Sequence, residues 1–408
     1  MVFRVRFRYA AAVLLMAVTA ISAAAQPTPG SILGVTPTGR VDPDRIRGMA
    51  EPLFDHWEVP ALPRSVDTYH IYYSTRDADG SPARILAQLF VPVFDETADR
   101  PVLVFGSGTT GVGDQCAPSL ERPIARRWGH YRANMLSYAS QGIITIFPDY
   151  LGFNDLERPQ RYFSKDAEAH TMLDAARAVG NFLASRNSLV QPSDHLFTSG
   201  YSQGGHAAFA AADLRQDYAP ELPLTGVIGF AATTDVETLF REGPYYAPNI
   251  VYSYLDMYGS REIVPERYFQ ERWAATIDDD VPRLCVDEFQ QYYPYDGKEL
   301  YTPEFYEALY ARDLEADFPE LARRLEENAT GLSGHGVPAL VVQGNQDIII
   351  TTPSQTEFVE ALRAAGSEVE YLTLDGVRHR DTRPAGFRDS VRWIKERSGL
   401  EGELGQLE

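Results

Sequence analysis

Several patterns that would assign a class at once are missing from this 408-residue sequence. It contains no H-E-x-x-H metal spacing and no glycine-rich dinucleotide fingerprint, so we expect neither a metal nor another cofactor. The glycine-rich segment 106–113 lacks the Gly-Lys-Ser/Thr ending of a phosphate-binding loop. No internal repeat or low-complexity tract is present. Beyond residue 25 no apolar run reaches transmembrane length, so stable membrane insertion is not expected.

The sequence also has fewer basic than acidic residues. The formal net charge is −20, from 37 basic and 57 acidic residues. Such a balance argues against nucleic acid and against anionic membrane surfaces as main partners. It is compatible with a small-molecule or lipid substrate, and it leaves the oligomeric state open.

The N-terminus has the features of a secretory signal peptide. Arg4, Arg6 and Arg8 give a basic start, and residues 9–21 are mainly apolar but short for a bilayer span. Three alanines before Gln26 offer a small-residue cleavage site. Residues 1–25 are therefore predicted to be removed, which places the mature protein outside the cell or in the periplasm.

Only two cysteines are present, Cys116 and Cys285, and both lie in the part predicted to be exported. An even pair in an oxidising compartment favours one disulfide. Two separate free thiols are the alternative, because sequence spacing does not fix the distance between two residues.

The most informative motif is Gly-Tyr-Ser-Gln-Gly at residues 200–204. It follows the apolar pair Leu196-Phe197 and precedes a helix-like segment, residues 206–214. A G-x-S-x-G sequence between a strand and a helix is typical of a nucleophile elbow, which presents its serine at a helix N-terminus. Ser202 is the predicted nucleophile, and the backbone N–H of Gln203 is a predicted oxyanion donor. An ordinary glycine-rich turn is the alternative.

An acid and a base follow at the ends of later strands. The run 337–344 is predicted to be a buried parallel strand, and Asp347 comes shortly after it. A second strand, 369–374, is followed by His379. Ser202, Asp347 and His379 reproduce the Ser-Asp-His order of the α/β-hydrolases. Asp375 is the competing acid, but it is expected to shape a turn. His206, in the first turn after Ser202, is expected to pack or cap.

The remaining pattern predicts a doubly wound, mainly parallel α/β sheet. Strands are expected at 69–74, 83–93, 101–105, 143–147 and 227–231. Helices are expected at 124–141, 166–185, 353–365 and 385–397. Residues 64–233 and 337–408 then form the core, and residues 26–63 an irregular N-terminal extension that wraps it.

Between residues 234 and 336 the strand–helix alternation stops. Helical periodicity appears at 265–276, 303–314 and 319–328, so this segment is predicted to be an inserted helical cap after the sixth strand. It holds 12 of the 23 tyrosines. They either line an apolar substrate pocket or pack the cap onto the core.

Four motifs together resemble the secretory lipase family of the lipase A type. They are G-T-T-G at 108–111, C-A-P-S at 116–119, P-D-Y-L-G at 148–152 and G-Y-S-Q-G-G-H-A-A at 200–208. The similarity extends from about Thr68 to the C-terminus. It implies an α/β-hydrolase that cleaves carboxylic esters, with the triad on Ser202, Asp347 and His379 and a loop oxyanion donor on Thr110. Many relatives have a histidine just before G-T-T-G, where this chain has Ser107.

The sequence therefore predicts a secreted carboxylesterase or lipase that works through an acyl-enzyme and needs no cofactor. A serine peptidase or amidase on the same fold is one alternative, since the triad serves both reactions. A catalytically silent binding module is another. Acyl chain length and alcohol preference are not determined by the fold or by the triad.

Overall fold

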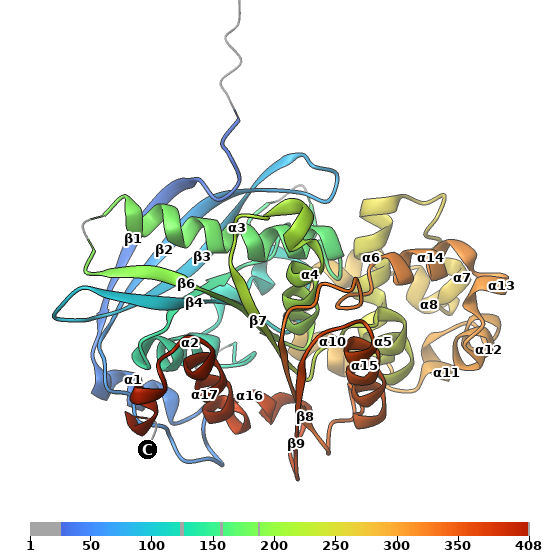
Figure 1. Ribbon diagram of the computed structural model, residues 1–408. Helices are drawn as coiled ribbons and strands as arrows, with labels where there is room; N and C mark the ends of the chain where they lie inside the picture. Colours follow the sequence, from blue (N-terminus) through green and yellow to red (C-terminus); the bar gives the residue numbers. More distant parts are fainter. Residues whose placement is uncertain (1–25, 123–125, 156–157, 187, 407–408) are drawn as a thin grey trace, which may run out of the picture.

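Nine strands form one sheet in the order β1-β2-β3-β5-β4-β6-β7-β8-β9 (Figure 1). The computed structural model describes residues 26–122, 126–155, 158–186 and 188–406. Strands β1, β2, β3 and β5 pair antiparallel in that order, and every pairing from β5 through β4 to β9 is parallel. This is the mainly parallel α/β-hydrolase sheet that the sequence predicts. The strands are β1 Ile32–Val41, β2 Val66–Arg76, β3 Pro82–Pro92, β4 Ala98–Gly106, β5 Ile144–Pro148, β6 Val190–Tyr201, β7 Leu224–Phe230, β8 Ala339–Gly344 and β9 Val369–Leu374.

Helices cover both faces of this sheet, as parallel strands require. Figure 1 shows α3 (Lys165–Ala184) and α4 (Gln203–Tyr218) on one face, and α2 (Tyr131–Ser140) and α17 (Phe387–Arg397) on the other. Strands β5 and β8 are buried at every residue, which explains their short and mainly apolar sequences. The remaining core helices are α1 Pro43–Ala50, α15 Thr352–Ala364 and α16 Thr382–Ala385.

The N-terminal extension is more regular than expected. Residues 32–41 form β1, which pairs antiparallel with β2 and adds an edge strand to the sheet, and α1 follows directly. Strand β1 carries few buried side chains, so its sequence lacks the apolar periodicity that reveals a strand. Because of this extra strand, the insertion follows the seventh strand of the chain and not the sixth.

One helix begins several residues later than predicted. We expected a helix over 124–141, of which 124 and 125 lie outside the described residues, but α2 begins only at Tyr131. The Glu121 carboxylate accepts the backbone N–H groups of Gly129, His130 and Tyr131 at 2.6–2.7 Å. Those N–H groups therefore have a side-chain partner in place of an earlier helical turn.

The segment between β7 and β8 contains only helices among its regular elements, and it extends to the right of the sheet in Figure 1. The helix expected over 265–276 is divided into α7 and α8, and the one expected over 303–314 ends at Ala311, where Arg312 adopts a left-handed φ of 57°. The helices are α5 Val236–Glu242, α6 Ala247–Tyr258, α7 Pro265–Tyr268, α8 Glu271–Ala274, α9 Ile277–Asp280, α10 Val286–Tyr292, α11 Gly297–Leu300, α12 Pro303–Ala311, α13 Leu314–Asp317 and α14 Pro319–Glu327.

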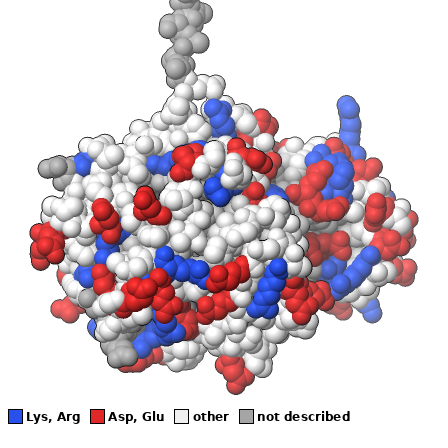
Figure 2. Space-filling view, in the orientation of Figure 1, with Lys and Arg blue, Asp and Glu red and all other residues white. Residues whose placement is uncertain are grey.

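The surface reflects the acidic composition. On the face shown in Figure 2, Asp and Glu side chains are spread over the sheet region and the insertion, with Lys and Arg interspersed. No helix in the described part of the chain is both long and apolar enough to cross a membrane.

Candidate active site

Ser202 lies at a sharp turn between β6 and α4. Its backbone has φ 55° and ψ −116°, a conformation that a non-glycine residue adopts only under strain. The glycines on either side permit the turn: a Cβ on Gly200 would lie 2.0 Å from the Gly204 carbonyl oxygen, and one on Gly204 would lie 2.0 Å from that of Gly106. Ser202 therefore stands at the N-terminus of α4, where the helix dipole favours negative charge.

His379 and Asp347 lie in the loops after β9 and β8. The Nδ1 atom of His379 is 2.7 Å from Oδ2 of Asp347, and both side chains are buried. The second carboxylate oxygen of Asp347 accepts the backbone N–H groups of Ile349 and Ile350. Asp347 is thus held by three hydrogen bonds, and it accepts the Nδ1 proton of the imidazole.

The other ring nitrogen of His379, Nε2, is buried and has no hydrogen-bond partner among the described residues. The ring lies 4.9 Å, between centroids, from that of Tyr201, the residue before Ser202. The imidazole with its unpartnered nitrogen therefore contacts the residue that precedes the strained serine.

Asp375, the competing acid, lies elsewhere. It is exposed, and its Oδ1 atom accepts the Asn345 side-chain amide at 2.7 Å. Asn345 also accepts the backbone N–H of Gly376. Asp375 thus takes part in the turn between β9 and His379, and the structure pairs His379 with Asp347.

The two predicted oxyanion donors come from opposite sides of the elbow. Neither the Gln203 N–H nor the Thr110 N–H donates a hydrogen bond to any group in the described part of the chain. The loop with Thr110 follows β4 and is fixed by tyrosines: the Tyr131 hydroxyl accepts the Gly108 N–H, and the Tyr150 hydroxyl donates to the Ser107 carbonyl, both at 2.7 Å. These two tyrosines support the loop where many relatives have a histidine instead of Ser107.

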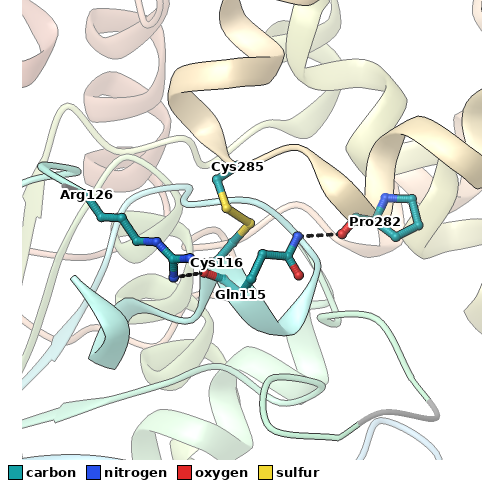
Figure 3. Close-up of a disulfide and its surroundings, with 5 residues drawn as sticks. All are labelled: Gln115, Cys116, Arg126, Pro282 and Cys285. Carbon is teal, nitrogen blue, oxygen red and sulfur yellow. Dashed lines mark hydrogen bonds between the residues drawn. A yellow bond between two sulfur atoms is a disulfide. The ribbon is translucent and has the colours of Figure 1, made fainter. Parts of the chain in front are cut away.

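The insertion holds the same loop from the other side. A disulfide joins Cys116 to Cys285 (Figure 3), as the sequence favoured over two free thiols. Beside it, the Gln115 side chain donates to the Pro282 carbonyl at 2.6 Å. The Val286 N–H donates to the Thr110 carbonyl at 2.9 Å. The backbone of Thr110 is therefore positioned in part by the insertion.

The C-A-P-S and P-D-Y-L-G motifs contact each other. Asp149 accepts both the backbone N–H and the hydroxyl of Ser119, at 2.8 and 2.7 Å. Burial raises the pKa of Asp149 to about 6, although the hydrogen bonds from Ser119 and Asn154 oppose the shift. This contact ties the segment just after the disulfide to the end of β5.

One buried carboxylate in this region was missed from the sequence. Glu168, on α3, is bonded to His206 and to the side chain of Gln203, all three buried. The sequence did offer one signal: Glu168 stands among alanines on the buried face of a predicted helix. A carboxylate is rarely buried unless it has a hydrogen-bond or ion-pair partner. His206 does pack in the core, as expected, but with both ring nitrogens engaged.

The tyrosines of the insertion differ in their places. Burial raises the pKa of Tyr245, and the charge of Asp347 adds to the shift, so this phenol lies within electrostatic reach of the histidine–aspartate pair. Tyr292 and Tyr293 pack edge-on against Trp273.

Among the described residues, no group of three or more His, Cys, Asp or Glu side chains is placed to hold a metal ion.

A nine-stranded sheet of this order, with a strained serine after β6 and a histidine–aspartate pair after β8 and β9, has the α/β-hydrolase fold. Among solved structures, that of the rice cell wall degrading esterase LipA from Xanthomonas oryzae is similar, with a TM-score of 0.69 and 20% identity. The match covers 93% of this chain and 99% of the other.

Sequence comparisons give the family. Residues 133–403 match the secretory lipase family, so the chain belongs to it and is a carboxylic ester hydrolase by class. A protein of Mycobacterium tuberculosis named "probable inactive lipase" is 22% identical over 82% of this chain and 74% of its own length. A "probable trichothecene esterase" of Stachybotrys chartarum is 26% identical over 57% of this chain and 49% of its own length.

Proposed function

We propose that this protein is an active serine hydrolase that cleaves carboxylic esters through an acyl-enzyme. One observation carries the proposal: His379 is held at Nδ1 by Asp347, 2.7 Å away, while its Nε2 atom is unpartnered and its ring contacts Tyr201, the residue before the strained Ser202. A general base needs this arrangement, with one nitrogen oriented by a carboxylate and the other available for the nucleophile.

The proposed reaction has two halves. Ser202 Oγ attacks the ester carbonyl carbon while His379 Nε2 takes the serine proton, and Asp347 stabilises the resulting imidazolium. The Gln203 and Thr110 N–H groups donate to the oxyanion of the tetrahedral intermediate. His379 then protonates the departing alcohol, which leaves an acyl group on Ser202. In the second half His379 takes a proton from water as the water oxygen adds to the acyl carbon, and it returns this proton to Ser202 Oγ as the acyl–serine bond breaks and the acid is released.

The insertion supports this proposal as a cap over the site. Ser202, Asp347 and His379 are each only 5% exposed, so the site is enclosed. The insertion contacts the loop of Thr110 through the disulfide and through the Val286 N–H. We therefore assign residues 234–336 as the cap and residues 64–233 and 337–408 as the core, with the cap forming part of the wall that receives the substrate.

The site is tested by active-site labelling with a fluorophosphonate probe. Wild-type protein should bind one probe per chain, on the peptide that contains Ser202, and should hydrolyse p-nitrophenyl esters. Ser202→Ala should not be labelled and should lose at least about 10⁴-fold in kcat. Ser199→Ala is the matched control, because Ser199 lies in β6, three residues before Ser202, with a buried hydroxyl; it should still be labelled.

Two alternatives are separated by the same assay. The Mycobacterium tuberculosis relative named "probable inactive lipase" favours a silent binding module as the second candidate. Wild-type protein that is folded but neither labelled nor active would support that candidate and contradict ours. An aminoacyl p-nitroanilide addresses the peptidase alternative, and faster turnover of this anilide than of esters would favour it.

Secretion is the last part of the proposal. The secretory lipase family and the disulfide support it, and residues 1–25, the predicted signal peptide, lie outside the described residues. N-terminal sequencing of the exported protein should begin at Gln26. A mature protein that retains Met1 would contradict the cleavage.

A further inference from the structure

A second histidine–carboxylate pair lies beside the candidate site, under the first turn of α4. The Nδ1 atom of His206 is 2.6 Å from Oε2 of Glu168, and the two side chains are 0% and 1% exposed. The other ring nitrogen, Nε2, is 2.7 Å from the carbonyl oxygen of Asn328, just after α14. The pair thus joins α3 and α4 of the core to the end of the insertion.

The partners of this pair fix its proton count. The Asn328 carbonyl can only accept, so Nε2 of His206 must carry a proton. The hydrogen bond between Nδ1 and the Glu168 carboxylate requires a second proton between those two atoms. The pair therefore holds two protons and has no net charge. Among the described residues, neither Arg nor Lys forms an ion pair with Glu168, so His206 supplies the compensating proton.

The other oxygen of Glu168 links the pair to the elbow. Oε1 accepts the Gln203 side-chain amide at 2.7 Å and the Phe163 N–H at 3.2 Å. The backbone N–H of His206 donates to the Ser202 carbonyl at 3.3 Å. Gln203, whose N–H is the proposed oxyanion donor, is thereby held at its side chain by Glu168.

Three buried tyrosines lie within electrostatic reach of Glu168. Burial raises the pKa of Tyr150, Tyr162 and Tyr254 well above the usual range, and the Glu168 charge adds to each shift. The ring of Phe163 lies edge-on to His206, with centroids 5.0 Å apart. A carboxylate without the shared proton would therefore place an uncompensated negative charge next to a forming oxyanion, which weakens its stabilisation.

We infer that Glu168 and His206 are positioning residues for the oxyanion hole. They act through Gln203: Glu168 fixes its side chain, and the neutral Glu168–His206 pair leaves no net charge next to the N-terminus of α4. The inference rests on the proposed function, in which the Gln203 N–H meets the oxyanion. Their effect should appear in the transition state and not in substrate binding.

The kinetic test uses Glu168→Leu, which, unlike Glu168→Gln, leaves no acceptor for the Gln203 side chain and the Phe163 N–H. On p-nitrophenyl acetate, kcat should fall by roughly 10- to 100-fold with KM within about twofold. The inhibition constant of a trifluoromethyl ketone, which forms the oxyanion adduct, should rise by a similar factor. Asp174→Asn is the matched control, since Asp174 is a buried, ion-paired carboxylate on the same helix but bonds Thr75, Tyr218 and Arg177. Its kcat should be unchanged.

Two further measurements decide the inference if Glu168→Leu folds poorly. Gln203→Ala leaves Glu168 and His206 in place but removes the side chain through which Glu168 acts, so it should lower kcat by a similar factor. In wild-type protein with labelled histidine, NMR at pH 8 should show a proton in each of the two hydrogen bonds of the His206 ring, assigned with His206→Gln. A single ring proton, or an unchanged kcat in folded Glu168→Leu or Gln203→Ala, would overturn the inference. Failure to label Ser202 with fluorophosphonate would instead overturn the proposed function.

Discussion

Two histidine–carboxylate pairs lie within the same fold, and they differ in whether Nε2 of the histidine has a hydrogen-bond partner. Asp347–His379 and Glu168–His206 have Nδ1-to-oxygen distances of 2.7 and 2.6 Å, and all four side chains are buried. Nε2 of His379 has no partner among the described residues, whereas Nε2 of His206 meets a carbonyl. A histidine with both nitrogens satisfied cannot exchange a proton with a substrate. The comparison teaches that the partner of the second nitrogen, and not the carboxylate, separates a histidine that is available as a base from one that is held in place.

The pairs also differ in what holds them. Asp347 and His379 come from core loops at the ends of neighbouring parallel strands, β8 and β9. The Glu168–His206 pair bonds the end of the insertion through Asn328. The disulfide, the Gln115 side chain and the Val286 N–H form further attachments between insertion and core. The first pair thus depends on the sheet, and the second on the docking of the insertion.

The largest expected effect tests whether Asp347 orients the base. Asp347→Asn should lower kcat by on the order of 10⁴, because an amide donor favours the wrong tautomer of His379. Asp375→Asn, four residues before His379, is the control and should change kcat only slightly. The measurement is ester hydrolysis at saturating substrate. Reversed effects, or a smaller loss for Asp347→Asn than for Glu168→Leu, would contradict the distinction between the two pairs.

The next prediction concerns the insertion's covalent attachment. Replacing Cys116 and Cys285 together by alanine should lower the free energy of unfolding by about 2–5 kcal/mol, since the disulfide closes a sequence separation of 169 residues. Urea unfolding of oxidised wild type and the double variant gives the difference. Non-reducing peptide mapping of wild type is the control for the bond. Equal stabilities would show that the insertion is held by its noncovalent contacts alone.

A third buried carboxylate, Asp149, tests what a pairing histidine contributes. Its partners are a hydroxyl and amide groups, and its pKa is raised to about 6 from 3.8. A raised folded pKa stabilises the fold below about pH 4, and this contribution is lost as the pH rises through 6. The stability of wild type relative to Asp149→Asn should therefore fall by about 3 kcal/mol from pH 4 to pH 8. Urea unfolding across that range measures it. A flat or rising difference would contradict the shift.

The smallest effect concerns the wall next to the base. Tyr245 is 5% exposed and near Asp347, whereas Tyr292 is 43% exposed and packs on Trp273. Tyr245→Ala should change the preference between short and long p-nitrophenyl esters by about tenfold, at the low end of the 1–3 kcal/mol expected per recognised methylene. Tyr292→Ala should leave the profile in place. If the two variants behave alike, the tyrosines of the insertion serve packing, and the acyl pocket is built elsewhere.

Sequence reasoning was most reliable where a local pattern has a single physical solution. Short apolar runs such as residues 143–147 and 339–344 can be buried on both faces only as central parallel strands. It was least reliable where a distant side chain sets a boundary. The start of α2 depends on Glu121, ten residues before Tyr131, and β1 is a strand because β2 is beside it.

The candidate site also has features that a local sequence pattern predicts and features that it does not. The motif around Ser202 and the chain order of Asp347 and His379 predicted the pairing that the structure shows, because the ends of parallel strands meet at one edge of the sheet. The contact of Thr110 with the insertion, and the bond from Glu168 to His206 across 38 residues, have no local signature. The sequence alone determined the elbow, the fold class and the order of the reactive groups. Only the tertiary structure decided which nitrogen of each histidine is left without a partner, since that depends on groups brought together from separate elements.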